Sequence, residues 1–433
     1  MTHAINQPPS LQQIVSCLSD YDPAALPVAQ AQNIIQQFVH PLDCVERIAI
    51  RQTLGRVLAE DIISTINVPA HDNSAMDGYA FKGSDLSEHG DNVFRIIGTA
   101  YAGKVFSGTV QAGECVRIMT GAVMPTGCDT VIPQELVSSI NDFQVNISST
   151  KIRTGENRRL KGEDLAIDKQ ALCKGKILRP ADLGLLASLG VAEVPVQRKL
   201  RVAFFSTGDE LRSLGESLDE GCVYDSNRYT LYGMLSRLGC EMIDMGVIKD
   251  DPEALEAAFR TACENADAII TSGGVSVGAA DYTKQIMAKL GDVAFWTIGM
   301  RPGRPMAFGK IHSHSHSAYL FGLPGNPVAV MVTFYFFARQ ALLHMMGSTQ
   351  QDFPLIPVTA KHPIRKRPGR TEYQRGILSR NATGELEVSV TGSQGSGILR
   401  SMSEANCMIV LHHDQNQVAT GDKVDVLLFE GLL

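Results

Sequence analysis

The chain has 433 residues, 44% of them hydrophobic, which is enough for several domains with cores of their own. Its net charge of −7 argues against wholesale nucleic-acid binding, and its nine cysteines never occur in CxxC spacing, so neither a disulfide framework nor a cysteine-rich zinc site is indicated. No secretory pattern opens the sequence, and the densest apolar stretch, residues 329–338, is too short to cross a bilayer. We expect a cytoplasmic protein that binds neither nucleic acid nor membranes.

Helical patterns frame the N-terminal part of the chain. Residues 1–25 read as a polar tail with a first helix, and residues 29–38 and 46–62 each show an apolar face with helical period. A further helical pattern covers residues 179–190 and ends in glycine, a common residue just past a helix.

A different composition separates these helical patterns. From residue 67 to about residue 162 the chain is rich in Gly, Val and Thr, and short strand-like runs alternate with turn signals. We therefore predict an elongated α-rich domain made of residues 26–62 and 163–196, with a mostly β domain, residues 63–162, inserted into it.

Strands and helices alternate in the next part of the chain, residues 197–347. Helical patterns separate four apolar strand patterns, which cover residues 200–205, 241–248, 266–270 and 318–322. This alternation predicts a doubly wound α/β domain. Short β runs with regular turns follow it and predict a small C-terminal β-barrel at residues 348–433.

Ligand-type residues follow the strands of this α/β domain. The segment TSGGVSVGAADY (residues 271–282) contains glycines that let backbone amides approach an anion closely. Since the carboxyl ends of parallel strands meet at one edge of a sheet, this segment should meet three others there: STGDEL, Asp250-Asp251 and GLPGNP. Clustered carboxylates beside such amides suit a Mg²⁺-bridged anion.

Purely structural roles compete with this interpretation. A strand-to-helix turn would also use the glycines of residues 271–282, and Asp251 and Asn326 are each suited to cap the helix that follows. Asp250 precedes the cap and is the better site candidate. The turn RPGRP adds Arg301 and Arg304, whose forked donors suit an oxyanion, although a surface turn would explain them too.

Other polar segments lie outside the strand ends. PAHDNSAMDGYA contains Asp77, MTGA contains Thr120 and GENRRLKGED contains Asp164, and each segment is either a site or a polar turn. The basic run 361–370 is either a solvated loop or a patch for a phosphorylated small molecule. Three histidines on one strand face could hold zinc, but a hairpin tip is the favoured interpretation of His312, His314 and His316.

Taken together, these segments resemble one family, the molybdopterin molybdenumtransferases (MoeA), to which the E domain of gephyrin belongs. The match runs from about Leu26 to the C-terminus, with the motifs in the family's order: PAHDNSAMDGYA, IMTGA, GENRRLKGED, FSTGDEL, YDSNR, TSGGVSV and GLPGNP. The resemblance implies an elongated α-rich region, an inserted β domain, a MogA-like α/β domain and a C-terminal β-barrel. It also implies a homodimer in which the inserted domain of one subunit completes the cleft of the other, and transient contact with a MogA-type protein.

The reaction that the resemblance implies is transfer of molybdate into adenylylated molybdopterin, which yields molybdenum cofactor and AMP with the help of Mg²⁺. The catalytic positions carried over are Asp77, Thr120, Glu210, Asp250 and Asp281. The metal would be held by Glu210, Asp250 and Asp281, with Asp164 as a further contributor. The positions implied for substrate binding are Ser206, Thr207, Gly208, Gly273, Gly274, Ser276, Arg301, Arg304, Pro324, Gly325 and Asn326.

The sequence departs from the family's pattern in two places. Ala279 stands where the family often has glutamate, and Arg301 and Arg304 replace a common pair of lysines. Molybdate and tungstate therefore both stay open as the oxyanion. A non-catalytic pterin-binding scaffold, or an enzyme that adenylylates molybdopterin, are the alternative functions.

Overall fold

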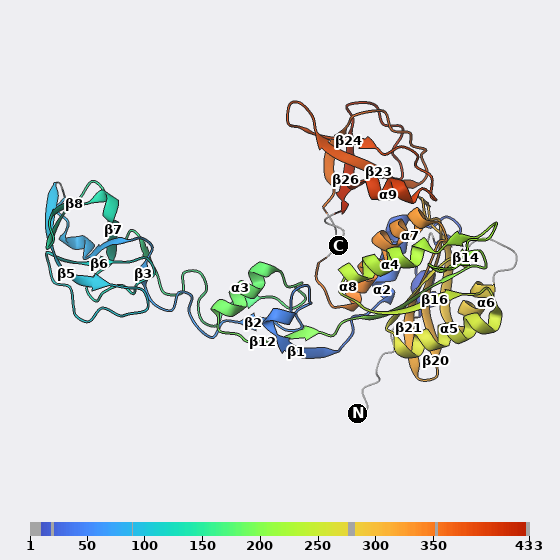
Figure 1. Ribbon diagram of the computed structural model, residues 1–433, viewed down its shortest axis with the longest axis horizontal. Helices are drawn as coiled ribbons and strands as arrows, with labels where there is room; N and C mark the ends of the chain where they lie inside the picture. The colour runs from blue at the N-terminus through green and yellow to red at the C-terminus, as the bar shows by residue number, and fades with distance from the viewer. Residues whose placement is uncertain (1–9, 19–20, 89, 276–281, 351–353, 430–433) are drawn as a thin grey trace.

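The computed structural model describes residues 10–18, 21–88, 90–275, 282–350 and 354–429. The molecule is elongated (Figure 1), with a small β domain at one end and an α/β domain at the other. A narrow connecting region joins them, and a C-terminal β-barrel lies against the α/β domain.

Two N-terminal helices belong to the core of the α/β domain. Helix α1 (Leu11–Ser16) begins with a capping box at Ser10, and α2 (Val28–Phe38) buries one face of helical period. Phe38 at the end of α2 packs edge-on against Phe308 and Tyr319, with ring centroids 5.6 and 5.9 Å away.

The connecting region consists mainly of paired strands. Strand β1 (Val45–Ala49) pairs antiparallel with β12 (Glu193–Gln197), and β2 (Ile62–Ile63) pairs with β11 (Gln170–Leu172). The helix expected over residues 46–62 is wrong: only a 3₁₀ turn, η1 (Ile50–Gln52), follows β1. Pairing with β12 buries Val194 and Val196 in a cluster with Leu58 and Leu186, so a distant strand overrides the local helical pattern. The helix expected at 179–190 is confirmed as α3 (Pro180–Ser188).

The inserted part of the chain is a six-stranded sheet in the order β7-β4-β6-β5-β9-β8. Phe81 and Phe94 pack on one side of it, and Ala80 and Val116 on the other. A short ladder, β3 (Asn73–Ser74) with β10 (Arg158–Arg159), flanks the sheet. The six strands are β4 (Gly78–Phe81), β5 (Asp91–Ala100), β6 (Glu114–Ile118), β7 (Thr130–Pro133), β8 (Ser138–Asn141) and β9 (Gln144–Ser148). The short 3₁₀ turns η2 (Gly83–Asp85) and η3 (Gln134–Leu136) connect them.

The α/β domain is a six-stranded mixed sheet in the order β16-β13-β17-β21-β20-β18, covered on both faces. Val202 and Phe204 of β13 face one core, and Ala203 and Phe205 face the other. Its strands are β13 (Arg201–Thr207), β16 (Glu241–Ile248), β17 (Ala268–Ser272), β18 (Gly291–Thr297), β20 (Pro305–Ser313) and β21 (His316–Leu323). Its helices include α4 (Ser226–Arg237), α5 (Pro252–Asn265) and α6 (Tyr282–Leu290), and a small ladder joins β14 (Leu211–Arg212) to β15 (Val223–Tyr224).

The histidine run lies at the tip of the β20–β21 hairpin, where Ser313 pairs with His316. This confirms the hairpin interpretation. Within the described part of the chain, no group of three or more His, Cys, Asp or Glu side chains could hold a metal ion, so the zinc alternative is not supported.

A long apolar helix follows β21. It comprises α7 (Pro327–Thr333), a π-helical turn η4 (Phe334–Ala338) and α8 (Arg339–Met345). Among the described residues this run alone is long and apolar enough to cross a membrane, but 78% of its apolar window is buried inside the protein. Such burial is typical of a core helix.

The C-terminal strands close into a barrel. Strands β22 to β26 pair in the order β23-β24-β22-β26-β25, and β25 pairs with β23 to complete the ring. Strand β19 (Met300–Arg301) of the α/β domain adds to β23 in parallel and so joins the barrel to the RPGRP turn. The barrel elements are β22 (Ile356–Ala360), β23 (Thr371–Arg380), β24 (Leu386–Val390), α9 (Leu399–Glu404), β25 (Cys407–Leu411) and β26 (Lys423–Leu428). A multidomain α/β protein with an inserted β domain and a C-terminal β-barrel is thus confirmed.

Candidate functional site

A cavity of about 1040 Å³ lies at the carboxyl ends of the parallel strands. We call it the strand-end cavity. The predicted site residues that line it are Thr207, Gly208, Glu210, Asp250, Gly273, Gly274, Arg301, Arg304, Pro324, Gly325 and Asn326. The convergence of the strand-end segments expected from a parallel sheet is therefore present in the structure.

Strand register aligns the ligand segments with one another. Ser206 of β13 lies beside Ser272 of β17, which in turn lies beside Leu323 of β21. The amide of Gly273 donates to the carbonyl oxygen of Leu323 at 3.1 Å, which continues the ladder by one residue. The segments that follow three neighbouring strands thus start at the same level.

Glycine is required at two positions of the cavity. Gly273 has φ +94°, and a Cβ there would lie 2.5 Å from the carbonyl oxygen of Thr207. Gly274 has φ +67°, and a Cβ there would lie 2.7 Å from the side chain of Thr283. Both conformations favour glycine, and both backbones pass too close to a neighbour for a side chain.

Two carboxylates line the cavity with oxygen atoms suited to a metal, those of Glu210 and Asp250. Asp250 accepts a hydrogen bond from Thr207 Oγ1. Asp251 instead caps α5 by accepting from Ala254 N at 2.9 Å, so the cap interpretation of Asp251 is confirmed. Because Mg²⁺ is often held by one or two carboxylates together with substrate phosphates and water, this donor set fits Mg²⁺.

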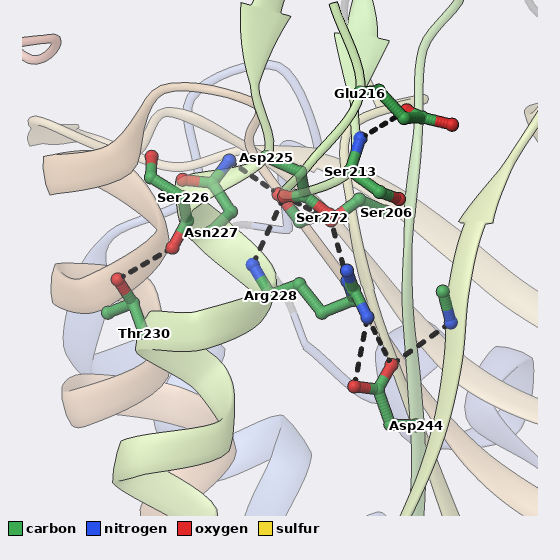
Figure 2. Close-up of polar contacts among 11 residues, drawn as sticks. Ser206, Ser213, Glu216, Asp225, Ser226, Asn227, Arg228, Thr230, Asp244 and Ser272 are labelled. Carbon is green, nitrogen blue, oxygen red and sulfur yellow. Dashed lines mark hydrogen bonds and ion pairs between the residues drawn. The ribbon is translucent and has the colours of Figure 1, made fainter.

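A third carboxylate, Asp225, is committed to the protein itself. It is 2% exposed, caps α4, and accepts from Ser206 Oγ at 2.9 Å. Arg228 donates to Asp225 and also to both carboxylate oxygens of Asp244, at 3.1 and 3.0 Å (Figure 2). Predicted residue Ser206 is therefore buried behind the cavity, where it holds the start of α4 against β13.

The barrel contributes a wall that sequence reasoning missed. Its cavity-lining residues are Arg370, Gln394, Ser396 and Gly397. Arg375, 1% exposed, supports that wall by donating to the carbonyl oxygens of Ser393 and Gly395, at 3.3 and 2.9 Å. Burial lowers the pKa of Arg375 to about 10, so the guanidinium stays charged at neutral pH. The one available signal was the basic run 361–370, which includes Arg370.

Other missed residues lie inside motifs that were already recognised. Asp225 and Asn227 belong to YDSNR, and Ser272 belongs to TSGGVSV. All three line the cavity. The available signal was their polar side chains at element ends: Asp225 directly before α4, Asn227 in the first turn of α4 and Ser272 at the last position of β17.

The predicted residues of the inserted region do not reach the strand-end cavity within one chain. Asp77 accepts from Thr120 through both the backbone amide, at 2.7 Å, and the hydroxyl, at 2.6 Å. These two hydrogen bonds lower the pKa of Asp77. Asp164 lies in the adjoining loop, where its amide donates to Val68 O. The inserted β sheet lies at the opposite end of the molecule from the α/β domain (Figure 1), whose strand ends form the cavity.

Two predicted residues, Ser276 and Asp281, and the departure at Ala279 lie outside the described residues.

Three family models cover most of the chain. "MoeA N-terminal region (domain I and II)" matches residues 26–190, "Probable molybdopterin binding domain" matches residues 203–344, and "MoeA C-terminal region (domain IV)" matches residues 357–429. The strand-end cavity combines residues from the second and third of these matches.

Named relatives match over more than nine tenths of this chain and of their own. A molybdopterin molybdenumtransferase of Haemophilus influenzae is 41% identical over 94% of this chain and 100% of its own, and one of Nostoc sp. is 36% identical over 92% and 93%. The crystal structure of the molybdopterin biosynthesis moeA protein of Pyrococcus horikoshii superposes with a TM-score of 0.81 at 27% identity, covering 94% of this chain and 100% of that one. The chain belongs to the MoeA family.

Proposed function

We propose that this protein is a transferase of molybdenum cofactor biosynthesis that inserts molybdate into adenylylated molybdopterin and releases AMP in the presence of Mg²⁺. The observation that carries the proposal is a cavity in which carboxylates, arginines and close-approach glycines meet, in a chain that matches a named molybdopterin molybdenumtransferase over 94% of its length.

The residues divide the chemistry among them. Backbone amides at Gly273 and Gly274 suit a phosphate, and the guanidinium groups of Arg301 and Arg304 suit a tetrahedral oxyanion. Glu210 and Asp250 would hold Mg²⁺, which supplies polarisation of the adenylyl phosphoanhydride. Thr207 donates to Asp250 and so fixes the direction of that carboxylate. The dithiolene sulfurs come with the substrate, so no cysteine of the protein takes part.

We further propose that the working form is a homodimer in the cytoplasm. Asp77 and Thr120 flank strands β4 and β6 of the inserted sheet, which lies far from the α/β domain (Figure 1), and this supports the proposal because a second subunit can bring its inserted domain to the cleft. The hydrogen-bonded Asp77–Thr120 pair is already formed in the single chain. A MogA-type protein, which supplies adenylylated substrate, is the proposed transient partner.

The test compares two neighbouring aspartates of the same charge. Purified wild-type protein, Asp250→Asn and Asp251→Asn are incubated with adenylylated molybdopterin, molybdate and Mg²⁺, and AMP release is followed. Asp250→Asn should lose release while Asp251→Asn, which changes only the α5 cap, retains it. Equal loss in both variants would remove Asp250 from the site.

The same assay separates the alternatives. A pterin-binding scaffold would bind the substrate tightly without AMP release, and Ala279 in place of the family glutamate is the feature that favours it. An adenylylating enzyme would consume ATP with molybdopterin. Tungstate in a parallel reaction reports which oxyanion the arginine pair accepts.

A further inference from the structure

Asn227 differs from the other cavity residues because only the nitrogen of its side-chain amide forms hydrogen bonds with described residues of the protein. It is 7% exposed, lies in the first turn of α4 and lines the strand-end cavity. Its Nδ2 donates to Ser272 Oγ and to the carbonyl oxygen of Gly325, both at 2.7 Å. Its Oδ1 is buried and accepts a hydrogen bond from none of the described residues.

The orientation of this amide follows from its partners. A carbonyl oxygen such as that of Gly325 can only accept, so the nitrogen must face it. Rotating the amide by half a turn would set two acceptors against each other and leave the donors without partners. Figure 2 shows the amide nitrogen directed at Ser272, while the oxygen makes no contact with the residues drawn.

The first turn of α4 is held firmly enough to present this oxygen. Asp225 caps the helix, Arg228 ties Asp225 to Asp244, and Ser206 fixes Asp225 to the end of β13. An uncompensated buried acceptor costs free energy, and such groups in native proteins generally have a partner. The strand-end cavity is where that partner can come from.

We propose that Asn227 is a ligand-binding residue of this cavity, whose Oδ1 accepts a hydrogen bond from an uncharged N–H or O–H donor of the bound substrate. Because an amide oxygen repels the oxygens of phosphate or molybdate, Asn227 would form its hydrogen bond with the organic part of the ligand. The inference rests on the proposed function, which offers two sources of such a donor: the pterin ring, or the ribose and adenine of the nucleotide.

Calorimetry with two named probes, AMP and molybdopterin, tests the assignment. The variants are Asn227→Leu, which removes the acceptor, and Asp244→Asn, which keeps Asn227 and weakens only the contact of Arg228 that supports the first turn of α4. Asn227→Leu should weaken binding of the probe that carries the donor by roughly ten- to a hundredfold, and Asp244→Asn should bind this probe with an affinity closer to that of wild type. Asn227→Ala serves as a second variant, since it removes the acceptor without adding a branched side chain. Thermal melting shows which variants fold.

A thermodynamic cycle distinguishes contact from support. If AMP is the affected probe, purine riboside monophosphate lacks the 6-amino group and 2′-deoxy-AMP lacks the 2′-hydroxyl, and the analogue without the contacted donor should bind wild type and Asn227→Leu alike. Equal losses of affinity for both probes, or a loss in Asp244→Asn as large as that in Asn227→Leu, would overturn the inference and leave Asn227 with a role only in supporting the first turn of α4. Unchanged affinity in Asn227→Leu would overturn it outright. Wild-type protein that binds neither probe would instead refute the proposed function, and the inference with it.

Discussion

The Gly273→Ala substitution tests whether the strand-end cavity depends on close backbone packing. A methyl group at this position would lie 2.5 Å from the backbone oxygen of Thr207, which cannot move without shifting the end of β13. The residue would also have to keep φ +94°, a conformation that side chains rarely adopt. Both effects act in the folded protein, and both should lower its stability.

Gly239→Ala is the matched control, because Gly239 has φ +73° and nothing within 4 Å of an added Cβ. Backbone strain alone should lower the free energy of unfolding of Gly239→Ala by about 1–2 kcal/mol, and the clash in Gly273→Ala should lower it by about 1–3 kcal/mol more. For a domain of this size, that difference corresponds to a Tm of Gly273→Ala lower by roughly 2–12 °C than that of Gly239→Ala. Thermal melting followed by circular dichroism measures this difference in Tm. Calorimetry with AMP measures whether the cavity still binds its ligand.

Equal Tm values for the two variants would refute the packing argument. Unchanged AMP affinity in a destabilised Gly273→Ala protein would show that the loop matters for folding and not for the ligand.

Three further predictions concern the Asp77–Thr120 pair, the dimer and the barrel wall of the cavity. Thr120→Val should raise the pKa of Asp77 toward its ordinary value of 3.8, because it removes the hydroxyl hydrogen bond that lowers this pKa most, while the hydrogen bond from the backbone amide of residue 120 remains; carboxyl-carbon NMR titration measures this. A carboxylate whose pKa is lower in the folded protein than in the unfolded chain stabilises the fold at pH values above the unfolded pKa. This stabilisation is lost as the pH falls through the folded-state pKa, so the wild-type protein should lose the contribution of Asp77 only at strongly acidic pH. Mixing inactive Asp77→Asn with inactive Asp250→Asn protein should restore AMP release if the two residues meet across a homodimer, and no recovery after verified subunit exchange would contradict that arrangement. Arg375→Met should weaken molybdate-dependent AMP release by loosening the loop at Ser393 and Gly395 while the barrel still melts cooperatively; unchanged release would show that this wall has no role.

Local patterns predicted the strand-end cavity because its geometry follows from topology. Parallel strands place their carboxyl ends on one edge, so Thr207, Asp250 and Gly273 come together whatever the exact register. The cap role of Asp251 was foreseeable for a similar reason, since Asp before Pro at a helix start has a local cause.

Other features depend on contacts between distant parts of the chain. The segment 46–62 has an apolar spacing that fits a helix, but β12, more than a hundred residues later, pairs with its first residues as a strand. The barrel wall is also non-local: Arg301 pairs with Glu372 through β19 and β23, and this brings Ser396 to the cavity. Neither strand pairing can be predicted from the local sequence pattern.

The most direct test of the central claim is AMP release from adenylylated molybdopterin by purified wild-type protein, with molybdate and Mg²⁺ added or withheld. We predict one AMP released per molybdenum cofactor formed, with release dependent on both additions. Tight substrate binding without release under all conditions would contradict the claim.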